Sequence, residues 1–415
     1  MDDISPSPEL LDSAVRRVFR IEDITLGNSR QEFLARYHGQ LMLDSEIAYD
    51  QLSAALQPYQ VTPLFRMEEG RQTIILVQGN PKPKPSNPKT NLVMFILTLI
   101  SVWVTGGFLA IGENDPIDFM SILTIILTRG WQFAISMIAI LGAHEMGHYW
   151  MGRHHKVDVT LPYFIPLPYP ISPFGTMGAF INMREIPRNR KMLLDIGIAG
   201  PLAGLIVAIP ILLLGIYLSP VQPLPGEAET RACVQELKLD PNADCTLSSL
   251  EGNSILYLAA KYLIKGELLP APADYGNRSN LQYWIAYLFT GHPLPFGGRD
   301  ILLHPVAWAG WAGLLVTALN LIPAGQLDGG HLLFVLLGSR RSRKLLPVVL
   351  IGLAVLSLFW TGWLLWVALI FFLGRAHAEP LDQITPLDTR RKLLAVLLLV
   401  IFILVFVPVP MIALQ

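Results

Sequence analysis

Two histidines four residues apart carry the clearest chemistry in the chain. His144 and His148 belong to the segment HEMGH, and Glu145 follows the first of them. On a helix, residues four apart share one face, so both imidazoles can bind one metal ion. This spacing is typical of zinc sites, in which the neighbouring glutamate accepts a proton from water. The sequence therefore predicts one zinc ion per chain, with His144 and His148 as ligands and Glu145 as the catalytic base.

The segment before this motif makes a chance pairing of histidines improbable. Residues 131–142 are almost wholly apolar, so the motif is predicted to lie inside a membrane helix. An ionisable side chain at bilayer depth costs about 2.5 kcal/mol or more, and such side chains are seldom without a function. A helix that merely happens to carry two histidines is the alternative, and this setting disfavours it.

A catalytic zinc ion needs a third protein ligand and keeps its fourth position for water. Asp328 is the favoured ligand, because it lies in an apolar region beside a proline-broken helix, where a carboxylate needs a cation. His154 and His155 fit interfacial charges, and Glu185 fits a solvated loop. Two candidates remain. Asp195 fits the start of a helix or a pair with a cation, and His331 fits either a residue that supports a metal ligand or the start of a helix.

The composition is that of a membrane protein. The 415 residues are 52% hydrophobic and 15% charged, with a net charge of -1 and a mean hydropathy of +0.45. We expect a mostly α-helical, polytopic membrane bundle of about six to eight spans. The near-neutral charge gives no indication of nucleic-acid binding. The acidic start, MDDIS, lacks the features of a signal peptide, which favours a bacterial protein or a trimmed plastid protein.

Three regions are expected along the chain. Residues 1–80 are predicted to form a small soluble α+β domain, and residues 81–90 a stiff linker of proline and lysine. Residues 91–415 form the membrane domain, in which residues 219–304 are a polar loop outside the cytosol. The elements expected in the first domain are a strand at 31–39, a helix at 44–56 and strands at 61–66 and 73–77.

The membrane domain is expected to contain several apolar spans and one irregular segment. Residues 161–170 are apolar but rich in proline, so they are predicted to be non-helical and buried in protein or along a cavity, and 175–182 to be extended. The segment 122–127 is expected to be a separate piece, interfacial or partly inserted in the membrane, that ends at Arg129. The predicted spans are 91–111, 131–151, 195–218, 305–321, 345–373 (a hairpin or one tilted span, broken at 361–362) and 393–411.

Basic residues predict the orientation of the chain. The lysines of the linker place the N-terminal domain in the cytosol, and the basic residues between 153 and 191 place the zinc-motif end on the same side. The polar loop then faces outward. It contains both cysteines, Cys233 and Cys245, for which a disulfide and two free thiols are equally open. Two amphipathic segments of this loop, 254–264 and 281–289, are expected to lie along the membrane surface.

Two motifs together resemble a known family. HEMGH at 144–148 in one membrane helix, and Asn320-x-x-Pro323 followed by Asp328-Gly329 in a later one, are similar to the site-2 protease family of intramembrane zinc metalloproteases. The resemblance implies cleavage of membrane proteins within or near their transmembrane segments. It also implies zinc binding by His144, His148 and Asp328, catalysis by Glu145, substrate or intermediate binding by Asn320, and a helix break at Pro323.

A further motif resembles one branch of that family. Gly27-Asn28-Ser29-Arg30 differs at one position from the Gly-Asn-Leu-Arg motif of the plastid and cyanobacterial "ethylene-dependent gravitropism-deficient and yellow-green" proteases. This branch implies a multi-pass protein of a cyanobacterial plasma or thylakoid membrane or of a plastid membrane, with the N-terminal domain on the cytosolic or stromal side.

Two other classes of protein remain alternatives. One is a zinc-bearing membrane scaffold or chaperone without protease activity, in which a ligand or the base would be expected to be missing. The other is a metal transporter, which predicts acids and histidines spread along a path, whereas the ionisable groups here converge. The extended segment 175–182 is either an edge that binds an unwound substrate or a plain structural hairpin.

Overall fold

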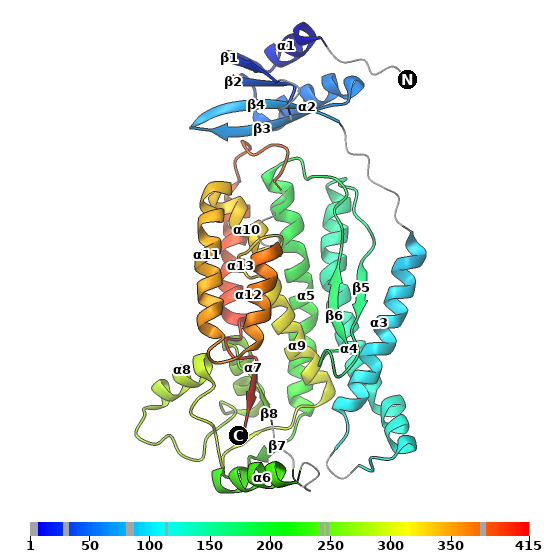
Figure 1. The fold of residues 1–415 in the computed structure, drawn as a ribbon, viewed down its shortest axis with the longest axis vertical. Helices are drawn as coiled ribbons and strands as arrows, with labels where there is room; N and C mark the ends of the chain where they lie inside the picture. The colour runs from blue at the N-terminus through cyan, green and yellow to red at the C-terminus, as the bar shows by residue number, and fades with distance from the viewer. Residues whose placement is uncertain are drawn as a thin grey trace.

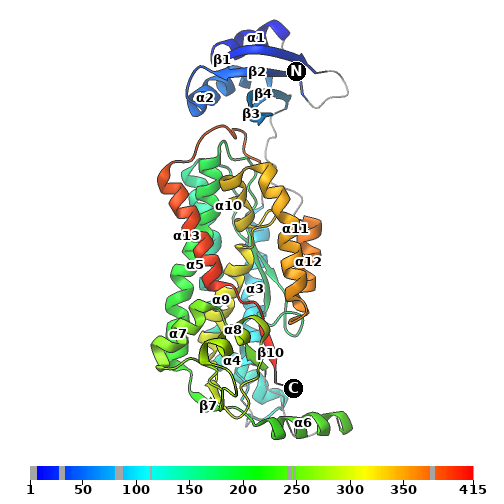
Figure 2. The same ribbon diagram turned by 90° about the vertical axis from the view of Figure 1, so that its left-hand side faces the viewer.

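A computed structural model of the chain describes residues 7–27, 33–79, 87–112, 115–240, 245, 249–373 and 379–414. Residues 28–30 of the Gly-Asn-Ser-Arg motif and most of the linker at 81–90 lie outside these residues. The chain has a long helical body with a small sheet at one end (Figure 1) and a mixed region of short helices and strands at the other (Figure 2).

The N-terminal region is a four-stranded antiparallel sheet of order β1-β2-β4-β3, covered by helices. The strand, helix and two strands expected here are present, but α1 and β1 before them were not predicted. In β1 most side chains are exposed or half-exposed, so it has little of the alternation that identifies a strand. The elements are α1 (Pro8–Arg16), β1 (Phe19–Leu26), β2 (Ala35–Leu41), α2 (Ser45–Leu56), η1 (Gln57–Tyr59), β3 (Val61–Glu68) and β4 (Arg71–Gln78).

Among the described residues, three helices are long and apolar enough to cross a membrane: α3 (Pro88–Leu109), α4 (Phe119–His154) and α5 (Arg190–Leu218). The molecule is therefore mostly helical, as expected. Five shorter helices complete the body, and they are α9 (Pro305–Asn320), α10 (Asp328–Leu337), α11 (Ser339–Leu356), α12 (Gly362–Leu373) and α13 (Thr389–Val405).

The body differs from the prediction at α4. This helix runs without a break from Phe119 to His154, so the prediction of a separate interfacial segment that ends at Arg129 is wrong. Arg129 does not end the helix because its guanidinium reaches sideways to Asp115, at 2.7 Å. Gly130 lies against α3, where a Cβ would be 2.4 Å from the carbonyl oxygen of Trp103. The charge of Arg129 is thus paired with a residue outside α4, and the helix continues past it.

The apolar stretch at 345–373 forms two helices, α11 and α12, so the hairpin alternative is correct. The break falls at Gly362, where α12 begins. Trp363 is fully buried, and its indole N–H donates to the carbonyl oxygen of Pro408 at 2.6 Å. This contact ties the hairpin to the chain that follows α13.

The proline-rich segment forms an antiparallel hairpin of β5 (Tyr163–Pro166) and β6 (Thr176–Phe180), which confirms the non-helical prediction. In Figure 1 the hairpin runs along the long helices beside α3. Side chains of α3 satisfy its backbone, because Asn91 donates to the carbonyl oxygen of Leu161 at 2.8 Å and Ser101 to that of Gly175 at 2.6 Å. Irregular backbone at this depth needs such partners.

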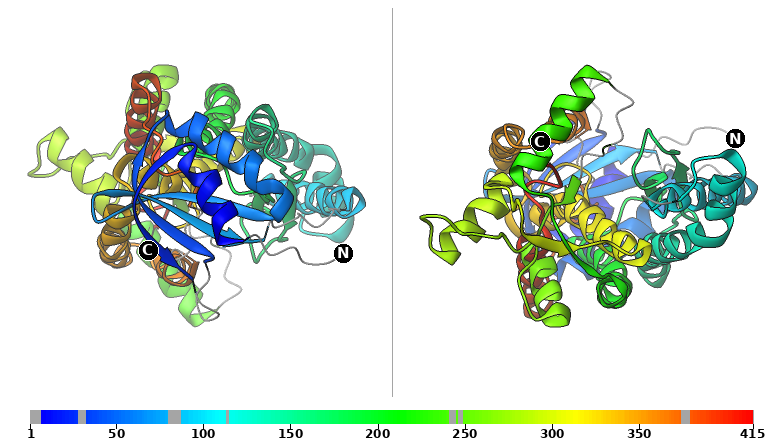
Figure 3. Two further views of the ribbon diagram at one scale, coloured as in Figure 1. Left: turned by 90° about the horizontal axis from the view of Figure 1, so that it is seen from above. Right: turned by 90° about the horizontal axis from the view of Figure 1, so that it is seen from below.

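The N-terminal sheet covers one end of the body (Figure 3, left), and hydrogen bonds join the two regions. The backbone N–H of Phe65 on β3 donates to the carbonyl oxygen of Leu381 at 2.9 Å. Ser45 donates to the carboxylate of buried Asp382 at 2.8 Å. Glu46 pairs with Lys191 in the first turn of α5 at 2.8 Å, so α2 contacts the helix that leads to the predicted site.

The opposite end is built from residues 219–304 and the C-terminal strand. Its elements pair as β7 with β9 and as β8 with β10. Cys233 and Cys245 form a disulfide, which decides between the two alternatives left open by the sequence. The elements are β7 (Val221–Pro223), α6 (Glu227–Leu239), β8 (Ser249–Glu251), α7 (Ile255–Lys265), α8 (Asn280–Thr290), β9 (Arg299–Ile301) and β10 (Met411–Ala413).

Two carboxylates share one lysine in the interior of this end. The Nζ atom of fully buried Lys261 lies 3.3 Å from Glu251 and 3.7 Å from Asp300. Tyr257 also donates to Glu251, at 2.8 Å. Burial raises the pKa of Asp300 to about 7, and one of its oxygens has no hydrogen-bond partner among the described residues. One lysine cannot neutralise both carboxylates, so Asp300 favours its protonated form.

The titration of Asp300 predicts a pH-dependent stability. An unfolded aspartate has a pKa near 3.9, so the folded chain binds the extra proton between about pH 4 and pH 7 and loses stability as pH rises through this interval. We expect the thermal unfolding midpoint of the wild type, measured in detergent, to be lower at pH 8 than at pH 5.5. The midpoint of Asp300→Asn should fall less over this interval. The midpoint of Asp274→Asn, which changes an exposed residue, should fall as much as that of the wild type. Equal pH dependence of all three proteins would contradict this account.

Candidate metal centre

The HEMGH segment lies inside α4, and its three ionisable side chains are buried. His144 is 4% exposed, Glu145 5% and His148 7%. The Nε2 atoms of the two histidines are 3.2 Å apart, which confirms that the helix stacks them on one face. Asp328 opens α10 and points an oxygen between them, at 3.4 Å from Nε2 of His144 and 3.3 Å from Nε2 of His148. The three residues are therefore brought together as expected.

These distances fit a zinc ion. Zinc binds nitrogen and oxygen ligands at about 2.0–2.1 Å, so tetrahedral ligand atoms are about 3.3 Å apart. Three ligand atoms at 3.2–3.4 Å leave room for the ion at their centre. Nδ1 of His148 donates to the carbonyl oxygen of Ile196 at 2.7 Å, which directs the lone pair of Nε2 toward that centre. His144, His148 and Asp328 can thus hold a metal ion.

Glycines of α5 allow this helix to pass directly against the imidazoles of both histidines. A Cβ on Gly200 would lie 2.0 Å from Nε2 of His148, and one on Gly204 would lie 3.2 Å from the side chain of His144. From the other side, a Cβ on Gly147 would be 2.5 Å from the carbonyl oxygen of Ala199. The sequence analysis did not link these glycines to the metal site, although glycine in a membrane helix permits close helix contact.

A sharp turn between α9 and α10 delivers Asp328. The helix α9 ends at Asn320, three residues before Pro323, and Gly325 has a positive φ of 56°. The backbone then folds back so tightly that a Cβ on Gly329 would lie 2.0 Å from the carbonyl oxygen of Leu321. The amide of Asn320 is 3.3 Å from Nε2 of His144, so the same turn brings Asn320 to the centre.

A cavity of about 410 Å³ opens onto these residues. Glu145 and Asn320 line it, together with residues 179–183, where the hairpin leaves β6. Ile181 and Glu145 line the same cavity, so the chain that leaves β6 borders the carboxylate. A molecule in this cavity would therefore contact the carboxylate, the amide and the metal ligands at once.

The other ligand candidates lie outside the cluster. Asp195 pairs with Arg391 at 2.6 Å and with His155 at 2.9 Å, so this carboxylate is neutralised by cations near the start of α5. Glu185 and His331 line the cavity but are not part of the group of ligand atoms that lie close together. The ring of His154 packs edge-on against that of His155.

An apolar helix that carries a buried His-Glu-x-x-His motif, completed by an aspartate from a second helix, is the arrangement of a membrane-embedded metallopeptidase. The family model "Peptidase family M50" matches residues 132–359, which is more than half of the chain. The chain therefore belongs to this family, the site-2 proteases, as the two motifs indicated.

Three relatives agree with the branch that the sequence resembles. The chain is 28% identical over 386 residues to "Probable zinc metalloprotease EGY2, chloroplastic" of Oryza sativa subsp. indica, covering 90% of the chain and 61% of the relative. The Arabidopsis thaliana protein of that name is 29% identical over 69% of the chain and 43% of the relative, and "Probable zinc metalloprotease EGY1, chloroplastic" is 27% identical over 71% and 46%. The chain thus spans about three fifths or less of these relatives. No solved structure matches it.

The packing of α5 predicts that Gly200 is needed for metal binding. In Gly200→Ala the new methyl group would overlap Nε2 of His148 and displace this ligand atom, so we expect zinc affinity to fall about tenfold or more. Gly197→Ala is the matched control, because a Cβ there would be 3.6 Å from His331, an ordinary contact. Competition with a fluorescent chelator measures both. Equal zinc affinity of the two variants would contradict the proposed packing.

Proposed function

We propose that this protein is an intramembrane zinc metalloprotease that hydrolyses peptide bonds within or near the transmembrane segments of membrane proteins. The observation that carries the proposal is the convergence of His144, Glu145, His148 and Asp328 on one cavity among apolar helices. Membership of the M50 family and the printed names of the relatives support it.

In this proposal His144, His148 and Asp328 hold one zinc ion. When bound, zinc lowers the pKa of a water molecule and polarises a substrate carbonyl group. The chain contributes the orientation of the ligands. The carbonyl oxygen of Ile196 accepts a hydrogen bond from Nδ1 of His148 and so fixes this ring. Gly200 and Gly204 leave space for the two imidazoles, because neither has a Cβ.

Glu145 serves as the general base and then as the general acid. Its carboxylate accepts a proton from the attacking water and passes it to the amide nitrogen that leaves when the peptide bond breaks. Its place next to both histidines on α4 puts the carboxylate at the cavity wall. Ile181, which follows β6, lines the same cavity beside it.

Asn320 binds the reacting peptide group. Its amide lies at the cavity wall beside His144, where it can donate a hydrogen bond to the carbonyl oxygen as negative charge develops. The break in the chain at Pro323 allows Asn320 and Asp328 to reach the same cavity from two successive helices.

The strand β6 provides an edge for an unwound substrate. Among the described residues, β6 pairs with β5 alone, and the residues that follow it line the cavity. A substrate strand added to this edge would run toward Glu145. The alternative, a hairpin that only closes the membrane face, predicts that substrate binding does not depend on this edge.

The proposal includes a membrane arrangement. The three long helices together with α9, α10, α11, α12 and α13 give about six to eight crossings of the bilayer. Residues 1–80 form a soluble domain on the cytosolic or stromal side, joined by the linker at 81–90 to the membrane domain at 91–415. The plastid relatives support a plastid or cyanobacterial membrane as its location.

Replacement of Glu145 tests the mechanism. We expect Glu145→Gln to keep one zinc per chain, because Gln retains the shape of the side chain, and to slow cleavage by about 10²- to 10⁴-fold, because the amide cannot accept the proton. Cleavage of a single-span substrate in proteoliposomes and the zinc content are measured together. Glu185→Gln is the control, because Glu185 lines the same cavity but lies outside the ligand group.

The outcomes separate the alternatives. Retained cleavage in Glu145→Gln would exclude Glu145 as the base. Zinc binding by the wild type without cleavage of any membrane helix would favour the scaffold, and zinc flux into the proteoliposomes would favour the transporter.

A further inference from the structure

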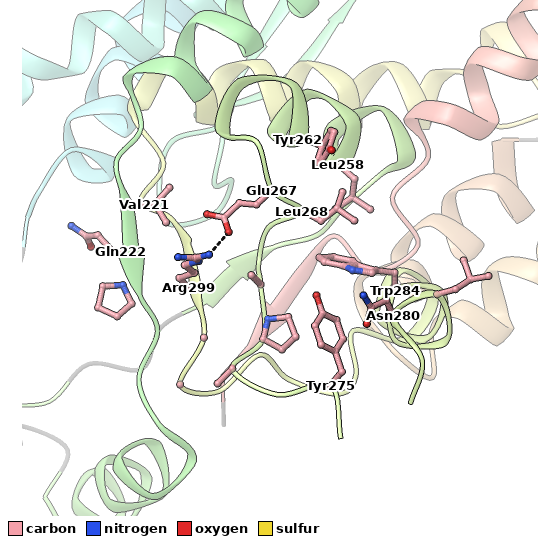
Figure 4. A pocket seen from close by; sticks show the side chains of 17 residues that line it. Val221, Gln222, Leu258, Tyr262, Glu267, Leu268, Tyr275, Asn280, Trp284 and Arg299 are labelled. Atoms are coloured by element: carbon pink, nitrogen blue, oxygen red, sulfur yellow. Dashed lines mark ion pairs between the residues drawn. The ribbon is translucent and has the colours of Figure 1, made fainter. Parts of the chain in front are cut away.

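A large cavity, separate from the one at the metal centre, lies between α7, α8, β7 and β9. Its volume is about 1230 Å³, compared with about 300–1,000 Å³ for typical small-molecule sites. Figure 4 shows Leu258 and Tyr262 entering it from α7, Val221 from β7 and Trp284 from α8. The lining is mostly apolar, so a ligand with a hydrocarbon portion fits it best.

The charged groups of the lining neutralise each other. Arg299 and Glu267 form an ion pair at 2.6 Å, drawn as a dashed line in Figure 4. Among the residues that the structure describes, no other charged side chain lines the cavity. The cavity therefore offers no net charge to an anionic headgroup, and recognition would come from the apolar part of the ligand.

The surface around this cavity continues the apolar surface of a candidate membrane span. Nζ of Lys265, the last residue of α7, donates to the carbonyl oxygen of Tyr217, one residue before the end of α5. Tyr217 is 71% exposed and Leu263 on α7 is 73% exposed. Exposed apolar side chains thus lie both at the end of a candidate membrane span and on the helix α7 that contacts it.

The helix α8 adds a second apolar face. Leu281, Ile285 and Phe289 recur every four residues and are each at least half exposed, whereas Tyr283 and Tyr287 on the other side are buried. The segment with α8 projects sideways from the helical body (Figures 1 and 3). An amphipathic helix of this kind is stable when its apolar face is buried in the membrane interface.

We propose that α7, α8 and the cavity between them form a lipid-binding site at the membrane surface, which takes the acyl chain of an uncharged or zwitterionic lipid. Continuity with α5 favours the bilayer as occupant, since a lipid can enter the cavity from the layer that already covers Tyr217 and Leu263. Tyr262, Tyr275 and Trp284 line the cavity, and such residues are enriched at membrane interfaces.

Site-specific labelling tests the surface independently of protease activity. The two native cysteines form a disulfide, so a thiol introduced by Leu263→Cys or Leu281→Cys can be labelled with an environment-sensitive fluorophore. Leu239→Cys is the matched control, since Leu239 is an apolar residue of α6, 88% exposed. The full chain is reconstituted in phosphatidylcholine vesicles.

We expect a lipid with a nitroxide near its headgroup to quench positions 263 and 281 several-fold more than 239, and aqueous iodide to do the reverse. Added anionic lipid should not change this pattern. Iodide access at 281 equal to that at 239 would overturn the proposal, as would protection of 281 from both quenchers, which indicates a protein partner or a second copy.

A cavity-filling variant tests the interior. A phosphatidylcholine with a photoreactive acyl chain should cross-link to peptides between residues 258 and 284 of the wild type. Leu258→Trp should reduce this several-fold, because Leu258 lines the cavity, and Leu239→Trp should not. Undiminished cross-linking in Leu258→Trp would exclude the cavity as the acyl-chain site.

Discussion

The structure depends on three ligand atoms that meet where water is scarce. Two imidazole nitrogens and a carboxylate oxygen lie 3.2–3.4 Å apart, so without a proton or a cation between them their lone pairs would repel each other. A divalent cation bound by His144, His148 and Asp328 would turn this repulsion into attraction. It would link α4 to α10 at the point where the proposed chemistry takes place.

The packing around the site positions these three ligand atoms. The helix α5 must lie close to α4 so that the carbonyl oxygen of Ile196 can orient His148, and only glycine at position 200 permits the approach. The chain must also leave α9 and turn within a few residues so that Asp328 faces His144. The hairpin supplies the remaining wall, and side chains of α3 satisfy its backbone at this depth.

More of the metal site than of the fold could be predicted from the sequence. His144, His148 and Asp328 were identifiable because ionisable residues in apolar surroundings need partners, and the hairpin because prolines exclude a helix. The roles of Gly200 and Ile196 could not be predicted, because they depend on how closely α5 approaches α4. Ile196 also acts through its backbone carbonyl group, which every residue type has. The continuity of α4 through Arg129 was missed because the ion pair with Asp115 forms between separate segments. The helix α10 begins at Asp328 and not at His331, since the turn itself starts the helix.

X-ray absorption at the zinc edge of the purified protein tests the central claim most directly, because it reports the atoms bound to the metal and their distances. The account predicts one zinc with a four-atom shell of nitrogen and oxygen at about 2.0–2.1 Å, including the outer-ring signal of two imidazoles. A shell that contains sulfur, a single imidazole, or a protein without zinc would contradict the site formed by His144, His148 and Asp328.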